Sequence, residues 1–221
     1  MGYGARKLHG NIQARSDARL THENNHSSTM IREIIITSTS PQGATHIAPM
    51  GVHVLDEALL IMPFRPSTTL DNILATGHAV MNYCDDVRVF AGCLSGRRDW
   101  PLVPTEQVPG QRLARALAHA ELELIRVEDD ASRPKLYCRV VHEANHAPFR
   151  GFNRAQYSVL EAAILVSRLA MLPWSKIEAE LDYLRIGLDK TAGPHELEAW
   201  GWLMEKVETF RRESTEQADQ P

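Results

Sequence analysis

Three consecutive hydroxyl residues at the start of a predicted helix have the chemistry to bind an anion. Ser67, Thr68 and Thr69 precede a helical spacing of apolar residues over 70–74. The first N–H groups of a helix lack partners within it, and the helix dipole favours negative charge there. Arg65, two residues earlier, could add a guanidinium to the same anion. The alternative is that Ser67 only caps the helix and Arg65 is solvated.

A second stretch, Thr45–Val54, resembles a strand but carries Pro49 and Gly51 two residues apart. Such residues lie on one face of a strand, where Pro49 donates no ladder hydrogen bond and Gly51 packs no side chain. Such a face suits a flat or bulky ligand that approaches the backbone. It also suits an edge strand with a bulge at Gly51. We interpret the two stretches as parts of one cofactor site.

Two further polar residues are candidates for the same site. Asn82 stands among apolar residues of a predicted strand. A buried amide needs hydrogen-bond partners, and a ligand hydroxyl or carbonyl would serve. Lys190 belongs to a predicted loop, 189–193, and its cation could reach a phosphate; the alternative is an ordinary loop residue. His46 and His53 are interpreted as exposed strand residues.

The composition restricts the classes of function. The chain has 221 residues, a formal net charge of −4 and a hydrophobic content of 43%. This acidic balance argues against binding nucleic acid through bulk charge. Ten histidines spread along the chain and three cysteines without paired spacing predict no metal site, reduced thiols and a cytoplasmic protein. No apolar run approaches about 18 residues, and the polar N-terminus lacks a signal-peptide core, so no membrane association is predicted.

The elements that must position these residues form a mainly β protein with helices. Residues 1–29 are predicted to be a flexible extension, and 30–150 a small antiparallel barrel of about six strands. One clear helix over 67–77 is inserted in the barrel, and a short one over 87–94 is also predicted. Proline and glycine residues make 95–110 a long loop, a candidate lid or dimer arm. The predicted strands are 31–39, 45–54, 58–64, 78–84, 114–128 and 135–143.

A helical part of about three helices is predicted over 151–221. The first helix covers 154–172, and a capping box at Ser175 starts a second that ends near Leu188. Pro194 opens the third, because proline is favoured at a first helical position. The tail after Arg212 is predicted to fray.

An ordered set of short motifs carries a resemblance to a known family. The motifs are Arg32–Thr39, Gly43, Ala48–Val52, Pro63-Phe64, Ser67–Asn72, Asn82, Asp85-Asp86, Glu161–Ile164, Ser167–Leu169 and Asp189–Thr191. Together they resemble the prokaryotic family known as domain of unknown function 447 (DUF447), over roughly residues 30–212. That family belongs to the FMN-binding split-barrel superfamily, with flavin reductases and pyridoxamine-phosphate oxidases.

The resemblance implies a homodimeric split barrel with FMN near the subunit interface. Residues Ala48, Pro49, Met50, Gly51 and Val52 would line the flavin ring. The phosphate would be taken by Ser67, Thr68 and Thr69, and the ribityl chain or ring edge by Asn82. Arg65 as a phosphate partner is an extrapolation from its position. The family also occurs in organisms with tetrahydromethanopterin-linked one-carbon metabolism, which suggests a pterin connection. The long N-terminal extension departs from the family pattern.

These expectations favour an FMN-dependent oxidoreductase that acts on a small molecule. No catalytic residue is assigned, because the flavin would carry the redox chemistry. No G-x-G-x-x-G motif indicates a Rossmann-type site for NAD. The alternatives are a non-catalytic flavin-binding or carrier protein of the same fold and a structural dimer module whose pocket has lost its function.

Overall fold

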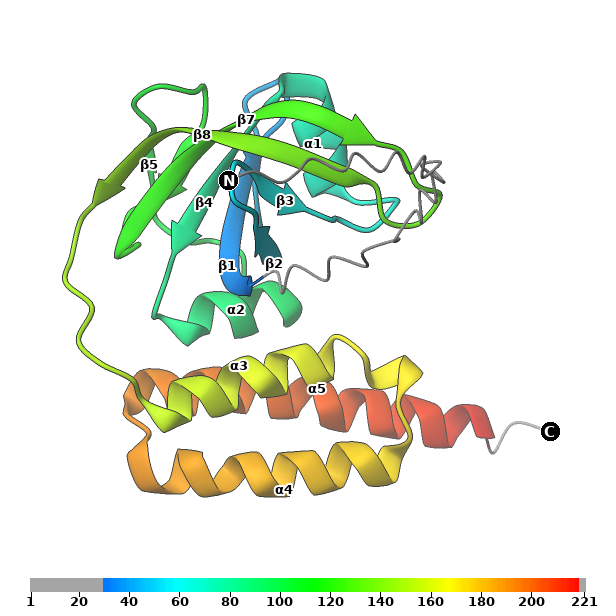
Figure 1. Cartoon of the computed structure of the whole chain (residues 1–221). Helices are drawn as coiled ribbons and strands as arrows, with labels where there is room; N and C mark the ends of the chain where they lie inside the picture. The colour runs from blue at the N-terminus through cyan, green and yellow to red at the C-terminus, as the bar shows by residue number, and fades with distance from the viewer. Residues whose placement is uncertain (1–29, 219–221) are drawn as a thin grey trace, which may run out of the picture.

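Six strands close into an antiparallel barrel in the computed structural model, which describes residues 30–218 (Figure 1). Their spatial order is β1-β2-β3-β8-β7-β4, and every neighbouring pair is antiparallel. The barrel predicted from the sequence is therefore confirmed, whereas the predicted extension, 1–29, lies outside the described residues. The strands are β1 Met30–Thr39, β2 Thr45–Val54, β3 Leu59–Ile61, β4 His78–Tyr83, β7 Ala118–Glu128 and β8 Lys135–Asn145.

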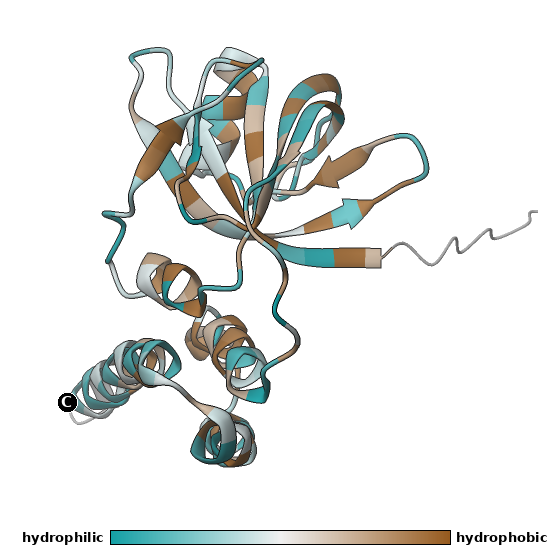
Figure 2. Cartoon of the chain, turned by 90° about the vertical axis from the view of Figure 1, so that its left-hand side faces the viewer, coloured by the Kyte–Doolittle hydropathy of each residue, from teal (hydrophilic) through white to brown (hydrophobic). Residues whose placement is uncertain are grey.

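Alternate residues of the strands fill the barrel interior. The hydropathy of the residues changes in bands along the strands (Figure 2). Ile34 and Ile36 of β1 and Val52 of β2 belong to this core. Helix α1, Thr68–Thr76, adds Leu70 and Ile73 to it. The helix ends at Gly77, whose φ of 76° is the left-handed conformation that glycine adopts at low cost.

The segment predicted as a long loop carries a short hairpin. Strands β5, Leu102–Pro104, and β6, Gln111–Leu113, pair with each other outside the barrel order. Strands of three residues that include a proline leave no periodic signal in the sequence. The predicted strand over 114–128 begins only at Ala118, because residues 114–117 form the turn that follows the hairpin.

Helix α2, Val87–Leu94, joins the barrel to the C-terminal helices. Val89, Phe90 and Cys93 pack with Ile35 against the outside of the barrel. Val87 and Ala91 instead belong to the core of the C-terminal helices. The barrel therefore carries two inserted helices, α1 and α2. Helix α2 packs against both the barrel and the C-terminal helices.

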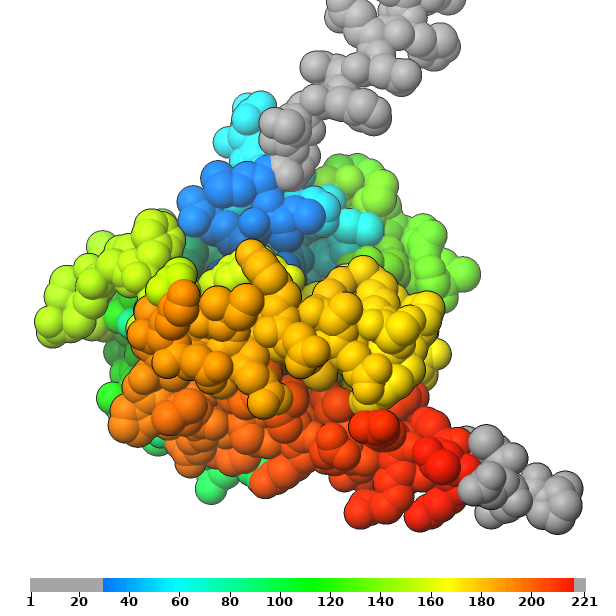
Figure 3. Space-filling view, turned by 90° about the horizontal axis from the view of Figure 1, so that it is seen from below, coloured from blue at the N-terminus to red at the C-terminus, as the bar shows by residue number. Residues whose placement is uncertain are grey.

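Three helices follow the barrel and pack below it: α3 Arg154–Val166, α4 Trp174–Thr191 and α5 Pro194–Ala218. Helices α4 and α5 lie on the face seen from below (Figure 3). The first predicted helix is shorter than expected, and a 3-10 turn over Leu169–Met171 follows it. The opening of α5 at Pro194 is confirmed. No helix of the described residues has the length and apolarity that crossing a membrane requires.

Three predicted boundaries in this part were wrong. Helix α4 begins at Trp174 after Pro173, and no side-chain hydrogen bond caps it, so the predicted capping box at Ser175 does not form. The helix also runs three residues beyond Leu188, so Lys190 lies in a helix instead of a loop. Helix α5 continues past Arg212 to Ala218.

Candidate functional site

The stretch Ala48–Val52 forms part of β2, and its side chains divide between the two faces of the barrel wall. Val52 is fully buried in the barrel core, and Met50 packs against that core. The register of β1 and β2 runs without a shift, so Gly51 lies opposite Glu33 and the alternative of a bulge is wrong. The side chain of Val52 is thus closed to a ligand, and these five residues cannot all face one.

An unpaired strand edge remains at this stretch. Strand β3 pairs with β2 only at Val52–Val54, so among the described residues Ala48–Gly51 has a strand neighbour on the β1 side alone. We call Ala48–Gly51 the free edge of β2. Proline is tolerated at such an edge because no ladder donor is needed there. Unpaired backbone groups can serve the carbonyl and N–H groups of a flat ligand.

Gly51 is set among side chains of β1. A Cβ placed on it would lie 3.0 Å from Ile31 Cγ2 and 3.4 Å from Glu33 Oε1. A larger residue would therefore displace Ile31. Burial and the nearby Glu161 carboxylate raise the pKa of Glu33, against an opposing effect of Arg168. This outer face of the strand thus looks toward α3.

The sequence offered two interpretations of the start of α1, a helix cap and an anion site, and the structure is compatible with both. Ser67 is the N-cap, and its Oγ accepts the N–H of Leu70 at 3.3 Å. Among the hydrogen bonds of the described residues, none takes the N–H of Thr68 or Thr69. The side chain of Thr69 is buried and that of Thr68 is exposed. Helix α1 also contacts β2. Two backbone donors and the Thr68 hydroxyl therefore remain for an anion at the start of this helix.

Two other candidates do not join the start of α1: Arg65 is paired with another residue, and Lys190 lies on a C-terminal helix. Arg65 Nη2 lies 2.9 Å from Asp129 Oδ1, and the Arg65 N–H donates to Ser132 O, so this residue is held at the β7–β8 turn. The expected phosphate contact of Arg65 is thus not supported. Lys190 is exposed on α4, which lies beyond α3 from the barrel (Figure 1), so within one chain it is far from α1.

Asn82 has a structural role in place of the expected ligand contact. Its amide is fully buried and donates to Ile35 O and Thr37 Oγ1, both at 3.2 Å. Its Oδ1 accepts the N–H of Leu113 at 2.7 Å. These partners satisfy the amide, so Asn82 fastens the β5–β6 hairpin to the barrel and has nothing left for a ribityl chain.

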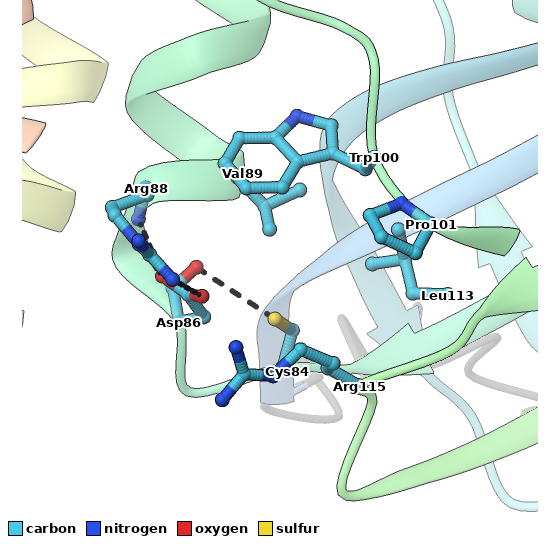
Figure 4. A pocket seen from close by; sticks show the side chains of 8 residues that line it. All are labelled: Cys84, Asp86, Arg88, Val89, Trp100, Pro101, Leu113 and Arg115. Atoms are coloured by element: carbon cyan, nitrogen blue, oxygen red, sulfur yellow. Dashed lines mark hydrogen bonds and ion pairs between the residues drawn. The ribbon is translucent and has the colours of Figure 1, made fainter. Parts of the chain in front are cut away.

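Two neighbouring pockets open where the barrel meets the C-terminal helices, and both are lined by Asp86 and Arg115. In the smaller one, of about 110 Å³, Trp100 and Pro101 form one wall and two guanidinium groups lie across from it (Figure 4). The larger, of about 370 Å³, adds polar side chains. Its further lining residues include Asp85, His146, Gln156, His195 and Glu196. Neither pocket is lined by the free edge of β2 or by Ser67–Thr69.

The cysteine of the smaller pocket is not set up as a nucleophile. Burial raises the pKa of the Cys84 thiol to about 12, so the thiol is protonated at neutral pH. Burial alone would raise the pKa of Asp86, but hydrogen bonds from Arg88 lower it, so Asp86 is ionised. The sequence analysis did not single out Trp100 or Arg115 as pocket residues, although Trp100 lies in the long predicted loop.

A cluster of histidines and carboxylates lies on the outer face of β7 and β8. The buried Glu121 carboxylate accepts the N–H groups of Glu106, Gln107 and Val108, each at 2.7 Å. Although burial opposes it, these bonds and one from His119 lower the pKa of Glu121 to about 2. His142 lies opposite Glu121 in the register. The expectation that the histidines are scattered was therefore wrong for this group. The signal was the alternation His119-x-Glu121 together with the spacing His142-x-x-x-His146.

The fold and these site elements define a split β-barrel with a C-terminal helical part. The sequence model described as "Protein of unknown function (DUF447) N-terminal domain" matches residues 32–147, and that described as "Protein of unknown function (DUF447)" matches residues 153–205. The chain belongs to the DUF447 family. The resemblance stated from its motifs is confirmed.

Solved structures with a similar fold include an FMN-bound DUF447 protein from Methanosarcina mazei. The TM-score is 0.69 at 19% identity, over 80% of this chain and 94% of that one. A 2-nitrobenzoate 2-nitroreductase from Pseudomonas fluorescens matches 51% of this chain and 64% of its own, with a TM-score of 0.46 and 19% identity. A nitrilotriacetate monooxygenase component B from Bacillus cereus matches 64% of this chain and 86% of its own, with a TM-score of 0.46 and 17% identity. No curated protein matches the chain.

Proposed function

We propose that this chain binds FMN and uses it as an oxidoreductase on a small molecule. The observation that carries the proposal is the start of α1, a helix that contacts β2, where the hydrogen bonds of the described residues leave the N–H groups of Thr68 and Thr69 for an anion. The FMN bound by the similar DUF447 protein supports the choice of cofactor. The donor set fits a phosphate ester, because neutral hydroxyl and backbone N–H groups bind phosphate at helix starts.

The residues divide the work of holding FMN. Thr68 and Thr69 would take the phosphate, and the free edge of β2 would meet the flavin ring through its backbone. When bound, FMN supplies the hydride or electron transfer, and the protein contributes binding and orientation. Arg65, Asn82 and Val52 have no part in this assignment, because their side chains are committed to Asp129, Leu113 and the barrel core.

The binding step is tested with protein freed of any bound flavin. We expect added FMN to raise the melting temperature and riboflavin, which lacks the phosphate, to raise it less; FMN at about 100 times its dissociation constant adds about 2.7 kcal/mol to the free energy of unfolding. No shift with FMN would overturn the proposal. Turnover of NADH or NADPH by the loaded protein distinguishes the enzyme from a flavin carrier, which would be inert.

The substrate proposal goes one step further and rests on the family resemblance. A reduced pterin of one-carbon metabolism is the candidate. We expect a reduced tetrahydromethanopterin or folate derivative to change the spectrum of the bound flavin. An unchanged spectrum with each would remove the pterin candidate and leave FMN binding untouched.

A further inference from the structure

The outer face of β7 and β8 brings together nitrogen and oxygen atoms that could hold one metal ion. His119 Nε2 lies 3.1 Å from Glu121 Oε1. The ligand atoms offered by His119, Glu121 and His142 all lie within 4.8 Å of one another. His119 and Glu121 are fully buried, whereas His142 retains 25% of its side-chain exposure. These three come from facing positions of two paired strands, so the barrel itself fixes their spacing.

A second observation points to a missing partner in this cluster. The Nε2 atom of His142 is buried, yet within the described residues it makes no hydrogen bond. Glu106 Oε2 approaches it to 3.4 Å, an ion-pair distance without hydrogen-bond geometry. A buried imidazole nitrogen without a partner costs free energy, so such an atom calls for an explanation. A cation between His142 and Glu121 would provide one.

We propose that His119, Glu121 and His142 bind a divalent transition metal ion, with Zn²⁺ as the first candidate and Glu106 as the fourth ligand. Imidazole nitrogen and carboxylate oxygen are ligands that Zn²⁺ accepts, usually four in a tetrahedron. Two ligand atoms on one such ion, each about 2.0–2.2 Å from it, lie about 3.3–3.6 Å apart in a tetrahedron. The 3.1 Å between His119 and Glu121 is near this separation, and since no two of the three ligand atoms are more than 4.8 Å apart, His142 needs to move by about an ångström at most.

The hydrogen bonds around the cluster are compatible with an ion. Glu121 Oε2 accepts the N–H groups of Gln107 and Val108, and Oε1 accepts only that of Glu106 from the backbone. Oε1 therefore keeps one lone pair, which faces His119. An ion takes that place when His119 carries its proton on Nδ1. That Nδ1 lies 2.9 Å from His146 Nε2, which then accepts the proton's hydrogen bond. A metal-bound histidine usually has such an outer partner.

The ion would cross-link the β5–β6 segment to the barrel. Glu106 belongs to the segment between β5 and β6, and Glu121 already holds this segment through three backbone N–H groups. An ion shared by Glu106 and the two barrel strands would fasten that segment further. Four protein ligands leave no open coordination position, so the site would be structural. This role does not depend on FMN.

Metal content is measured on full-length protein after treatment with a chelator and dialysis. We expect one equivalent of added Zn²⁺ to bind per chain and to raise the melting temperature. Loss of an outer-shell partner weakens metal binding about 10–100-fold, so loss of a ligand in His142→Ala should weaken it at least about 100-fold. His53→Ala removes a histidine of β2 and should bind as the wild type does. Cobalt in place of zinc should give visible bands beyond the flavin absorption, absent in His142→Ala.

Two further variants guard against a change in folding. Glu106 is 60% exposed, so Glu106→Gln alters the fourth ligand with little effect on the fold, and we expect weaker zinc binding. His142→Cys supplies another zinc ligand and should retain binding. No stoichiometric binding by the wild type would overturn the proposal. Equal affinity in the wild type and His142→Ala would overturn it too, because it would place the ion elsewhere on the chain.

Discussion

At the scale of single residues, the cap of α1 and the proposed phosphate site next to it can be tested separately at Ser67. Its hydroxyl caps α1 through Leu70, while the phosphate donors proposed next to it are the backbone N–H groups of Thr68 and Thr69. Aspartate caps a helix as well as serine does, but its charge repels a phosphate. Alanine removes the cap and leaves the backbone donors in place. The aspartate substitution should therefore affect mainly FMN binding, and the alanine substitution mainly stability.

We predict that Ser67→Asp keeps the melting temperature and weakens FMN binding at least about tenfold, since about 1.4 kcal/mol of repulsion suffices for that. Ser67→Ala should lower the free energy of unfolding by about 1 kcal/mol and change FMN affinity less. Fluorescence titration with FMN and thermal melts measure both. Ser175→Asp, an exposed change in the first turn of α4, is the control for added charge. Unchanged FMN affinity in Ser67→Asp would place the phosphate elsewhere.

The residues predicted correctly from the sequence are those whose partners are local. The cap at Ser67 needs only Leu70, three residues away, and the turn at Gly77 needs only its own φ. Asn82 was misassigned because its acceptor oxygen is satisfied by Leu113, 31 residues further on. Arg65 was misassigned likewise, because its ion-pair partner, Asp129, is far along the chain. A sequence shows that a buried polar residue needs a hydrogen-bond partner. It does not show whether that partner is a ligand or a protein group far along the chain.

At the scale of elements, α2 contributes side chains to two cores, one against the barrel and one among the C-terminal helices. The segment after α2 turns back on it so closely that a Cβ at Gly92 would lie 2.7 Å from the backbone oxygen of Arg97 and 2.9 Å from Trp100 Cζ2. Backbone at that distance has to move to admit a methyl group. Gly201, in α5, has nothing within 4 Å of such a Cβ. Gly92 and Gly201, both within helices, therefore make a matched pair.

We predict that Gly92→Ala lowers the free energy of unfolding by about 1–3 kcal/mol, as overpacking does. Gly201→Ala should raise it by up to about 1 kcal/mol, because alanine is the better helix former. Chemical denaturation of the two variants beside the wild type measures this. Equal effects of both substitutions would mean that the contact between α2 and Arg97 does not limit stability.

A second feature of α2 makes stability depend on pH. Asp86 caps the helix and binds Arg88, which also reaches Glu198 of α5 at 3.3 Å. Burial acts to raise the pKa of Asp86, but the bonds from Arg88 lower it below the ordinary value. A carboxyl whose folded-state pKa is depressed stabilises the protein above its unfolded pKa. That contribution is lost as pH falls through the folded pKa, which here lies below about pH 4.

We predict that Asp86→Asn, which keeps the cap and removes the charge, costs about 2 kcal/mol of unfolding free energy at neutral pH. The difference from the wild type should shrink as pH falls below about 4, because the wild-type Asp86 then gains a proton. Denaturation curves from neutral pH to about pH 3 measure the difference. A difference that stays constant over this range would show that the ion pair with Arg88 contributes nothing.

The elements themselves were predictable in proportion to their length. The barrel strands and α1 have apolar periodicity and end signals within a few residues, and Pro194 marks the start of α5 without help from the rest of the chain. The end of α4 was misplaced because Leu188 packs in the helical core, which carries the helix beyond the last local signal. The hairpin of β5 and β6 depends on Asn82 and could not be seen in its own three-residue strands.

At the scale of the whole molecule, the homodimer expected from the family is a proposal that the surface makes testable. Strands β7 and β8 expose four apolar side chains, Ile125, Val127, Val140 and Val141. Exposed apolar side chains on paired strands are candidates for an interface, and we propose a second copy of this chain as the partner. An interface on the barrel wall would let the partner cover a flavin held at an open strand edge.

Ile125→Lys tests this arrangement. Ile125 is 52% exposed, so the monomer tolerates lysine there, whereas an interface would bury an unpaired charge. That burial costs about 3 kcal/mol or more, which raises the dissociation constant of the dimer at least about 100-fold. Light scattering coupled to size exclusion measures the mass. If the flavin site needs both subunits, FMN affinity in this variant should fall as the protein is diluted.

Ile186→Lys is the matched control, because Ile186 is 50% exposed but lies on α4, beyond α3 from the barrel. We expect it to remain a dimer with wild-type FMN affinity. The reverse result, a monomer with lysine at Ile186 and a dimer with lysine at Ile125, would assign the interface to the helices. In that case exposed Lys190 of α4 could approach the FMN of a partner subunit, which the distance within one chain does not allow. A wild-type chain that is monomeric with FMN bound would remove the dimer from the proposed function and leave the cofactor in place.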